Sequence, residues 1–393
     1  MLELIINQNN NLETICLVED GKLIEKYQNN EDTKNNRLEG NIYAGKVADI
    51  VPGMQSAFVD YGAPKNGLLH LKDALPQVDE KNEKSPDFSN LKISDILKQN
   101  QKILVQIKKD SNDKKGAKIS THITIPSRYI VYMPNTNIIT ISQKISEEKV
   151  KQELLDFVKK QLNENDGAVI RTSAIDASKE EIKKDIERCK RKWEKILENY
   201  EKSDAGALIY ESESVQAKIL IDVKVDKIIT NSKLEYEKIK KLIEYEEMVG
   251  VKLEYSPKND LLDLYELNKQ IEKSKERKIW LNCGGFITID RTEALTAIDV
   301  NTGKFTGKTD LENTVFKVNK EATIEIAKQL RLHDIGGIVI IDYIDMHNND
   351  NKEKIQDLLK EQLKKDRAKT QVEGFTKLNL MEMTRKHICS HLD

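Results

Sequence analysis

Two apolar runs that each end near an aspartate constrain this chain more than any other feature. The first run covers residues 294–301 and carries Asp299, and the second covers residues 338–343 and carries Asp342. Buried strands of α/β proteins tend to place catalytic and cation-binding carboxylates at one edge of a sheet, because neighbouring strand ends converge there. The plainer alternative is that each aspartate caps the turn that follows its strand.

The segment between the two runs favours the shared site. Residues 310–331 repeat apolar side chains at roughly helical spacing, and a Gly-Gly pair follows them. A strand, a helix and a strand of this length make a crossover unit, in which both strands run parallel and end on the same side. Asp299 and Asp342 are then neighbours, and Asn301 projects from the same edge. Because Mg²⁺ prefers oxygen ligands and needs few protein carboxylates beside a substrate phosphate, this edge predicts hydrolysis at phosphorus.

The composition indicates a soluble, intracellular enzyme with several subdomains. The chain has 393 residues, no run of eighteen apolar residues and no signal-peptide pattern, so we expect neither a membrane span nor secretion. The net charge of −2 argues against indiscriminate nucleic-acid binding, so any nucleic-acid contact must use local patches. The cysteines form no Cys-x-x-Cys pair and predict neither a zinc ribbon nor a disulfide framework: Cys16, Cys189, Cys283 and Cys389.

The N-terminal third reads as strands. Residues 1–38 contain a candidate hairpin around Asp20-Gly21, and residues 39–122 alternate short strands with turns. The strands expected in the second stretch are residues 42–50, 56–61, 67–71, 102–108 and 115–125. Five such strands fit an OB-fold barrel, whose face binds single-stranded nucleic acid through stacking aromatics and a basic rim.

Candidate RNA contacts on this barrel are aromatic and basic. Phe58 and Tyr61 are candidates for base stacking. The lysines that supply positive charge are Lys108, Lys109, Lys114, Lys115 and Lys118. An equally good alternative is that Phe58 belongs to the barrel core and that the lysines lie in a solvated loop.

The middle of the chain offers one weak phosphate-binding pattern. Residues 167–173 read as a strand leading into a turn that carries Arg171 and Thr172, and a charged helix is expected from about Ser178 to Tyr200. A guanidinium beside a hydroxyl suits a terminal phosphate, although a surface strand end explains the pair better when it is taken alone. Residues 217–222 predict a strand, and the Lys- and Glu-rich helices up to residue 278 read as solvated faces.

One further pattern imitates a nucleotide-binding loop. Residues 303–309 read GKFTGKT between an expected strand and an expected helix. A P-loop needs four residues between its two glycines, and only three stand here, so its backbone amides would not surround a phosphate in the same way. We therefore do not expect an NTPase.

Two long segments resemble the active-site segments of the bacterial ribonuclease E/ribonuclease G endoribonucleases. They are GGFITIDRTEALTAIDVNTG at residues 284–303 and AKQLRLHDIGGIVIIDYIDM at residues 327–346. Shorter matches lie earlier in the chain, at residues 41–47, 57–62 and 170–172, and they occur in the same order as in the family. The resemblance covers nearly the whole chain and is weakest at residues 175–280.

The resemblance implies an α/β protein with several subdomains. Residues 1–38 and 217–278 would form two parts of a ribonuclease-H-like subdomain that resembles a nuclease in fold without supplying the active site. An OB-fold barrel at residues 39–122 and a 5′-sensor region at residues 123–216 would be inserted between these parts. Residues 279–393 would form a DNase-I-like catalytic subdomain.

The resemblance also implies a reaction. Asp299 and Asp342 would hold Mg²⁺, or Mn²⁺, and Asn301 would orient a ligand or water. The substrate would be single-stranded, AU-rich RNA, cut better when it carries a 5′-monophosphate, and the products would carry a 5′-phosphate and a 3′-hydroxyl. Such an enzyme would act in the cytoplasm in mRNA decay and rRNA processing.

The family's RNA contacts map onto named positions of this chain. A Phe at the position of Phe58 and a Lys at that of Lys115 contact RNA, but Leu68 stands where a second aromatic is expected. Arg171 and Thr172, with a residue at the position of Val131, would form the pocket for the RNA 5′-monophosphate.

Two other acidic residues near the active-site segments rank lower. Asp345 lies three residues beyond Asp342, so strand alternation would point it to the opposite face. Asp290 precedes the active-site strand. We expect structural roles for both.

Two further expectations concern an alternative function and the association of the chain with other proteins. A non-catalytic OB-fold RNA-binding or regulatory protein is the alternative function, but it would not need the acidic pair. Members of the family usually continue into a Cys-Pro-x-Cys pair that shares one Zn²⁺ between two subunits, whereas here Cys389 stands alone with His387 and His391 nearby. We therefore expect no zinc link of that type, at most a weak homodimer through other surfaces, and no scaffold tail for a degradation complex.

Overall fold

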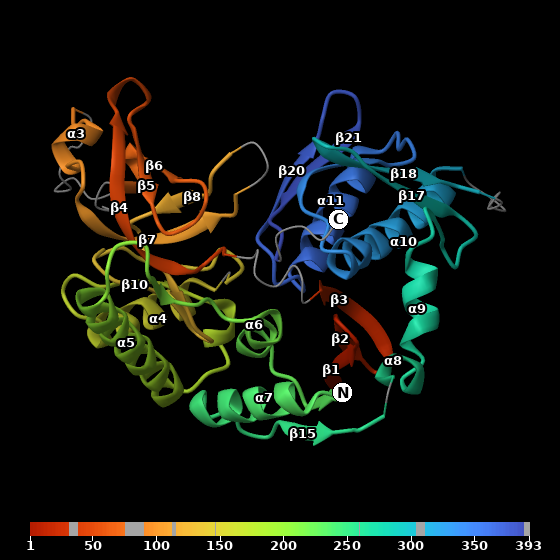
Figure 1. Cartoon of the computed structure of the whole chain (residues 1–393). Coiled ribbons are helices and arrows are strands. Elements are labelled where there is room, and N and C mark those ends of the chain that lie inside the picture. Colours follow the sequence, from red (N-terminus) through yellow and green to blue (C-terminus); the bar gives the residue numbers. More distant parts are fainter. Residues whose placement is uncertain are drawn as a thin grey trace. The chain divides into compact units, whose positions relative to one another are not determined.

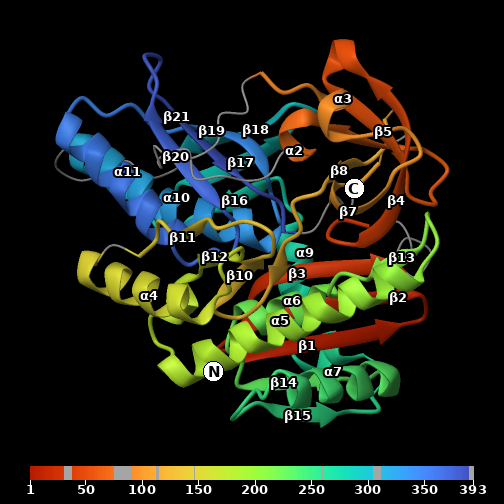
Figure 2. The same ribbon diagram turned by 90° about the vertical axis from the view of Figure 1, so that its left-hand side faces the viewer.

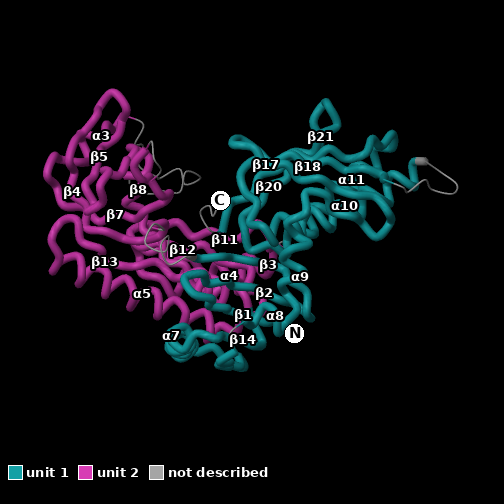
Figure 3. The backbone as a smooth tube through the Cα atoms, turned by 45° about the vertical axis from the view of Figure 1, so that its right-hand side comes forward, with its two compact units in different colours: residues 1–34, 224–393 teal, residues 35–223 magenta. Residues whose placement is uncertain are grey.

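The protein divides into two compact units, shown by a computed structural model in Figure 3. One unit contains residues 1–34 and 224–393, and the other contains residues 35–223. The structure describes residues 1–30, 38–74, 90–111, 115–145, 147–258, 260–303 and 311–388. The strands in these residues form four sheets, so the chain is mixed α/β as its sequence predicts (Figure 1). Within the same residues, no helix has the length and apolar character that crossing a membrane requires.

The first unit contains a five-stranded sheet built around the N-terminus. Its strand order is β15-β14-β1-β2-β3, with β14 parallel to both β1 and β15. The bounds are β1 Leu2–Asn9, β2 Leu12–Glu19, β3 Lys22–Asn30, β14 Lys227–Thr230 and β15 Lys252–Tyr255, with helices α7 Lys233–Tyr245, α8 Leu261–Leu264 and α9 Leu267–Ser274. The predicted hairpin is confirmed: Glu19 pairs with Lys22, and Asp20 and Gly21 have φ of 48° and 75°, as a type I′ turn requires.

The second sheet of this unit carries the two apolar runs. Its strand order is β16-β17-β18-β19-β21-β20, and β18 and β19 run parallel. The bounds are β16 Lys278–Trp280, β17 Phe286–Arg291, β18 Leu295–Asn301, β19 Gly337–Asp342, β20 Thr370–Phe375 and β21 Leu380–Arg385, with helices α10 Leu311–Leu332 and α11 Asn349–Leu363. Helix α10 connects the two parallel strands, so the predicted crossover unit is confirmed.

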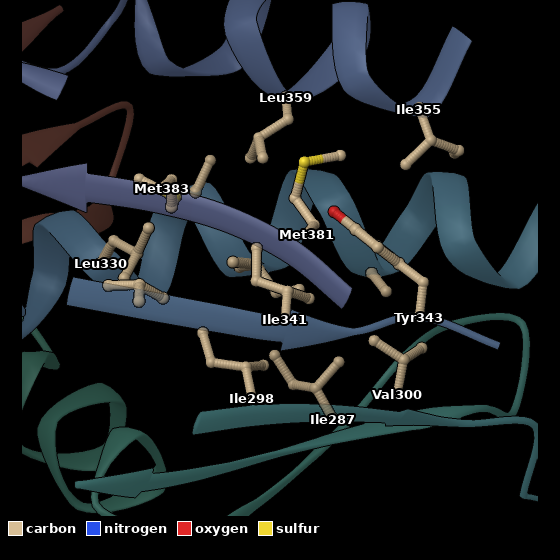
Figure 4. Close-up of a cluster of buried hydrophobic side chains, with 14 of the residues drawn as sticks. Ile287, Ile298, Val300, Leu330, Ile341, Tyr343, Ile355, Leu359, Met381 and Met383 are labelled. Atoms are coloured by element: carbon tan, nitrogen blue, oxygen red, sulfur yellow. The ribbon is translucent and has the colours of Figure 1, made fainter. Parts of the chain in front are cut away.

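Helices α10 and α11 pack on one face of this sheet and form its core. Their apolar side chains meet those of the strands, and Figure 4 shows Ile355 and Leu359 of α11 pointing toward Met381 and Tyr343. Alternation along each strand then decides what faces the other way: Ile298 and Val300 are buried, whereas Asp299 between them is exposed. The face away from the helices therefore carries Asp299 and Asp342, together with apolar residues such as Ala297 and Ile338.

In the second unit, five strands close into a barrel. β4 pairs with both β5 and β7, and β6 and β8 complete the ring, as in an OB fold. The bounds are β4 Ile42–Val51, β5 Ser56–Asp60, β6 Gly67–His70, β7 Lys102–Lys109 and β8 Lys118–Ser120, with β13 Leu208–Tyr210 added to β4 and short helices η1 Pro52–Met54, α2 Leu71–Ala74 and α3 Ile93–Ile96. The expected strands of this region are present, although β8 is shorter than residues 115–125.

The remaining sheet of this unit has the order β11-β12-β10-β9. The bounds are β9 Ile125–Pro126, β10 Ile130–Met133, β11 Ile139–Ile141 and β12 Gly167–Ile170, with helices α4 Glu148–Gln161, η2 Thr172–Ala174, α5 Lys179–Lys202 and α6 Val215–Asp222. Helices α4 and α5 lie side by side beside this sheet (Figure 2). The predicted charged helix is confirmed as α5, which begins with a capping box between Ser178 and Glu181.

The strand predicted at residues 217–222 is wrong. These residues belong to helix α6, whose first turn is capped by Ser214, since its hydroxyl accepts a hydrogen bond from the amide of Ala217 at 3.3 Å. Short apolar runs do not distinguish a buried strand from a buried helix, and here the cap decides.

A buried arginine fixes the start of β19. Arg385 of β21 is fully buried and donates hydrogen bonds to Asp366 and to Asp334, each at 2.7 Å, and to the carbonyl of Ile335 at 3.0 Å. Asp334 and Ile335 lie just before β19. The network therefore ties the entry of this strand to the neighbouring strand β21.

We expect Arg385→Leu to destabilise the first unit by about 3–5 kcal/mol, because it leaves the carboxylate of Asp366 buried without its partner. Urea unfolding followed by circular dichroism measures this loss. Arg277→Gln is the matched control, since it breaks an exposed pair with Asp290 on the same sheet and should change stability little. Equal stability of the two variants would contradict a structural role for the buried network.

Candidate functional site

The two aspartates lie opposite each other on neighbouring parallel strands. Asp299 of β18 is in register with Asp342 of β19, and both are the exposed members of their alternating strands. The strand pairing predicted from the sequence is thus confirmed, and the roles of these residues stay a prediction. Adjacent strands lie roughly 5 Å apart, so one small cation can reach both carboxylates.

Asn301 completes the polar group at this edge. It follows Asp299 by two residues, so it lies on the same face, and its side-chain amide donates a hydrogen bond to Asp299 Oδ2 at 2.5 Å. This bond restricts the rotation of the Asp299 carboxylate. Asn301 can therefore orient one acid of the pair.

Negative charge is concentrated around Asp342. Partial burial, together with the charges of Asp299 and Asp345, raises the pKa of Asp342 above its ordinary value. The expected position of Asp345 needs correction, because β19 ends at Asp342 and strand alternation does not continue to residue 345. The charge of Asp345 nevertheless acts on Asp342. Asp290, by contrast, is held by Arg277 at 2.7 Å, in keeping with a structural role.

The donors of this group suit a hard divalent cation. Carboxylate and amide oxygens are the ligands that Mg²⁺ prefers, and a cation would relieve the repulsion that raises the pKa of Asp342. Across the part of the chain that the structure describes, no cluster of three or more His, Cys, Asp or Glu side chains could enclose a metal. One or two carboxylates are enough for a Mg²⁺ ion that keeps its waters, so Asp299 and Asp342 fit such an ion.

A buried asparagine on α10 fixes the segment after β19, and it was not predicted from the sequence. The side-chain amide of Asn319 donates to the carbonyl of Ile344 at 2.8 Å, and its oxygen accepts from the amide of Ile344 at 3.1 Å. Asn319 is fully buried, so these bonds lie in a low-dielectric environment. The signal was present, because Asn319 stands at helical spacing between Val315 and Ile326 on an otherwise apolar face.

Glu312 and Thr323 extend this support along α10. Glu312 accepts hydrogen bonds from the side-chain amide of Asn351 at 3.0 Å and from the backbone amides of His347 and Asn348, each at 3.2 Å. These bonds, that of Asn351 first, lower the pKa of Glu312. Thr323 shares a buried hydrogen bond of 2.9 Å with the hydroxyl of Tyr343. The backbone around Asp342 is thus positioned by a single helix.

On the barrel, the two aromatic candidates differ in exposure. Phe58 is half-buried and pairs with Leu68 of β6, which in turn pairs with Lys118 of β8. Tyr61, however, is 1 % exposed and contacts Tyr43 edge to face at 5.2 Å. Tyr61 is therefore a core residue, and its ring is not available for stacking.

The basic candidates of the barrel are also placed. Lys115 is exposed, and Lys118 forms an ion pair with Asp73 at 3.1 Å. Lys114 lies outside the described residues. Lys109 is exposed, and the ammonium group of Lys108 donates a hydrogen bond to Gln106 Oε1 at 2.9 Å. The described part of the barrel thus offers Phe58, Leu68 and four of the five candidate lysines rather than two stacked aromatics.

The proposed sensor residues come together at one end of a sheet. Val131 of β10 pairs with Val169 of β12, and Arg171 and Thr172 follow directly after β12. The guanidinium of Arg171 donates to the carbonyl of Ser127 at 2.8 Å and forms an ion pair with Asp222 at the end of α6. The sequence could not reveal this ion pair, because Asp222 was expected in a strand.

Several other candidates from the sequence remain to be placed. Residues 304–309 of the loop that imitates a P-loop lie outside the described residues, as do Cys389 and His391. Burial raises the pKa of Cys16 to about 12, so this thiol is not a nucleophile. The ring Nδ1 of His387 lies 2.9 Å from the carbonyl oxygen of Asp334.

Comparisons with known proteins agree with the geometry. Residues 124–388 match the family model described as "Ribonuclease E/G family". The chain is 37 % identical to ribonuclease G of Salmonella typhimurium over 390 residues, which are 98 % of this chain and 79 % of that protein. It is 38 % identical to ribonuclease G of Haemophilus influenzae over 400 residues, which are 100 % of this chain and 81 % of that protein. It is 34 % identical to ribonuclease E of Escherichia coli over 373 residues, which are 92 % of this chain and 35 % of that protein.

We expect Asp345→Asn to lower the pKa of Asp342 toward its ordinary value, because it removes one of the negative charges that disfavour ionisation. Titration of the side-chain carboxyl carbons by NMR measures this shift. Asp290→Asn removes a charge from the same sheet that does not act on Asp342, so it is the matched control and should leave the pKa in place. An unchanged value in both variants would mean that burial and the charge of Asp299 raise the pKa of Asp342 without Asp345.

Proposed function

This chain belongs to the ribonuclease E/G family, and from that premise we propose that it is a metal-dependent endoribonuclease which hydrolyses single-stranded, AU-rich RNA in RNA processing and decay. One observation carries the proposal: Asp299 and Asp342 lie in register on neighbouring parallel strands, beside Asn301. Both carboxylates are exposed, so they would offer hard oxygen ligands to a cation on a sheet face that an extended polynucleotide could approach.

In this proposal Asp299 and Asp342 hold a Mg²⁺ or Mn²⁺ ion. When bound, the ion supplies charge stabilisation at the scissile phosphate and makes water a better nucleophile. Asn301 keeps the carboxylate of Asp299 in one orientation through their hydrogen bond, and Asn319 keeps the backbone after Asp342 in place. The chain's own contribution is therefore a preorganised pair of acids.

The proposed 5′-monophosphate preference rests on Arg171, Thr172 and Val131. Arg171 is held by the Ser127 carbonyl and by Asp222, so its guanidinium is already oriented before RNA binds. A terminal phosphate would share this guanidinium with Asp222, and the hydroxyl of Thr172 would add a donor. Competition with Asp222 would favour a doubly charged terminal phosphate over a singly charged internal one.

The barrel is proposed as the second contact with RNA. Phe58 offers a half-exposed ring for one base, and Lys115 offers a charge for the backbone. Leu68 beside Phe58 provides apolar contact without an aromatic face. We therefore propose a weaker grip on this surface than two aromatic rings would give.

The subdomain architecture is part of the same proposal. The five-stranded sheet would be the ribonuclease-H-like subdomain, made from residues 1–38 and 217–278. The barrel would be the OB fold of residues 39–122, followed by the 5′-sensor region of residues 123–216. The six-stranded sheet with α10 and α11 would be the DNase-I-like catalytic subdomain of residues 279–393.

We expect Asp299→Asn and Asp342→Asn each to reduce cleavage of a labelled single-stranded RNA at least about 100-fold in Mg²⁺, and chelation to abolish it in the wild type. The pKa of Asp342 is raised in the folded protein, so folding favours the protonated carboxyl group. The stability that this group contributes is present at acid pH and is lost as the pH rises through the raised pKa. Asp342→Asn should therefore remain folded at neutral pH.

Asp290→Asn, on the same sheet, is the control that should keep its activity. Near-wild-type turnover in either active-site variant would overturn the assignment of these acids. RNA binding by the wild type without any cleavage would support the alternative, a non-catalytic RNA-binding protein.

The 5′-sensor has its own test. Arg171→Gln should slow cleavage of 5′-monophosphorylated RNA about tenfold or more, toward the rate of the 5′-hydroxylated substrate, because charge-assisted hydrogen bonds to the phosphate are lost. Arg191→Gln, which removes an exposed charge from α5, should change neither rate. Equal rates on both substrates for the wild type would show that the sensor does not operate.

A further inference from the structure

Two aromatic rings and a lysine form a group on the open face of the six-stranded sheet. Trp280 of β16 pairs with Phe286 of β17, and their ring centroids lie 5.3 Å apart at an interplanar angle of 60°. The ammonium nitrogen of Lys278 lies 3.6 Å from the ring centre of Phe286 and 4.3 Å from that of Trp280. Cation–π attraction holds these three side chains together.

Strand register places this group beside the acidic pair. Phe286 pairs with Asn301, and in the next row Thr288 pairs with Asp299, which pairs with Asp342. Residues directly opposite each other project from the same face of a sheet. Trp280 is therefore two strands from Asn301, roughly 10 Å away, on the face that carries the carboxylates.

Trp280 is a large apolar side chain that does not pack into the core of the sheet, so its exposure calls for another explanation. Its side chain is 53 % exposed, whereas its neighbour Ile279 packs against the hydrophobic core. Part of the indole is covered by the turn at Gly303, since a Cβ there would lie 3.4 Å from Trp280 and 3.3 Å from Phe286. The turn therefore covers one side of the two rings, and about half of the Trp280 side chain remains exposed to solvent.

We propose that Trp280 and Lys278 form a nucleotide subsite next to the scissile phosphate. The base of one nucleotide stacks on the exposed indole, and a phosphate of the same strand pairs with the Lys278 ammonium. Phe286 supports both side chains from the neighbouring strand. The subsite deepens the proposed endoribonuclease function and rests on it.

Single-stranded RNA fits this group for chemical reasons. Every base has a π face, so an indole accepts any of them, and a lysine near a carboxylate pair neutralises part of the repulsion that an incoming phosphate meets. The RNA strand needs to span only the distance between Trp280 and the two carboxylates, which lie on one face of the sheet. The subsite therefore favours unpaired RNA without reading its sequence.

Binding is measured on the full chain in an Asp299→Asn background, with a fluorescently labelled single-stranded RNA and anisotropy as the readout. We expect Trp280→Leu to weaken binding about tenfold, in line with the loss of one base–aromatic stack, and Trp280→Phe to retain most of the affinity. Tyr255→Leu is the matched control, because Tyr255 is an exposed aromatic that also pairs with another ring, Tyr236, on a different sheet. It should bind like the parent.

The phosphate contact is tested by salt dependence. Lys278→Gln should reduce the slope of log Kd against log salt concentration by about 0.7, the contribution of one phosphate in single-stranded nucleic acid, and Lys278→Arg should preserve the slope. An unchanged slope in Lys278→Gln would overturn the phosphate contact.

An abasic scan identifies the nucleotide. One base is removed at each position within three nucleotides of the cleaved bond, and the affinity of each RNA is measured for the parent protein and for the Trp280→Leu variant. If a base stacks on Trp280, one position loses affinity in the parent and loses none in Trp280→Leu, which is the non-additivity of a direct contact. Additive losses at every position would overturn the stacking.

Tryptophan emission gives an independent readout. The chain has two tryptophans, and Trp193 is only 8 % exposed, so Trp193→Phe isolates Trp280 as the reporter. RNA should quench this emission. Cleavage by the wild type without quenching would overturn the subsite alone, whereas quenching and Trp280-dependent binding without any cleavage would retain the subsite and overturn the nuclease function.

Discussion

The parallel pairing of β18 and β19 is the constraint on which the rest of the six-stranded sheet depends. Parallel neighbours need a crossover, and here α10 makes it on the same face that α11 covers. With both helices on one face, alternate residues of β18 and β19 are buried there and the residues between them are left on the open face. The same packing that buries Ile298 and Ile341 therefore exposes Asp299 and Asp342 side by side.

Much of this arrangement could be predicted from the sequence, because it follows from periodicity. Apolar runs separated by a segment of helical period define the crossover, and the crossover places Asp299 beside Asp342 without knowledge of any contact. The turn at Asp20 and Gly21 was equally local. Where only local information was needed, the prediction and the structure agree.

The features that escaped prediction depend on contacts between distant residues or on the exact end of an element. Residues 217–222 were apolar enough for either a strand or a helix, and the cap at Ser214 decided for a helix. That error concealed Asp222 as the partner of Arg171, 51 residues away. Asp345 was placed by an alternation that stops at Asp342, and Tyr61 looked like a stacking residue until its burial in the barrel was known.

The alignment of Asp299 with Asp342 depends on contacts on the buried side of the sheet. A slip of one residue between β18 and β19 would turn Asp342 toward the helices and bring Ile341 to the open face. Two polar contacts oppose such a slip at opposite ends of β19: Arg385 holds the carbonyl of Ile335 before the strand, and Asn319 holds both backbone groups of Ile344 after it. Either bond set would break if the strand moved by one residue, and buried polar groups would then lose hydrogen bonds that water does not replace. These buried polar groups therefore favour one register of β19, and the proposed metal site depends on that register because it places Asp342 opposite Asp299.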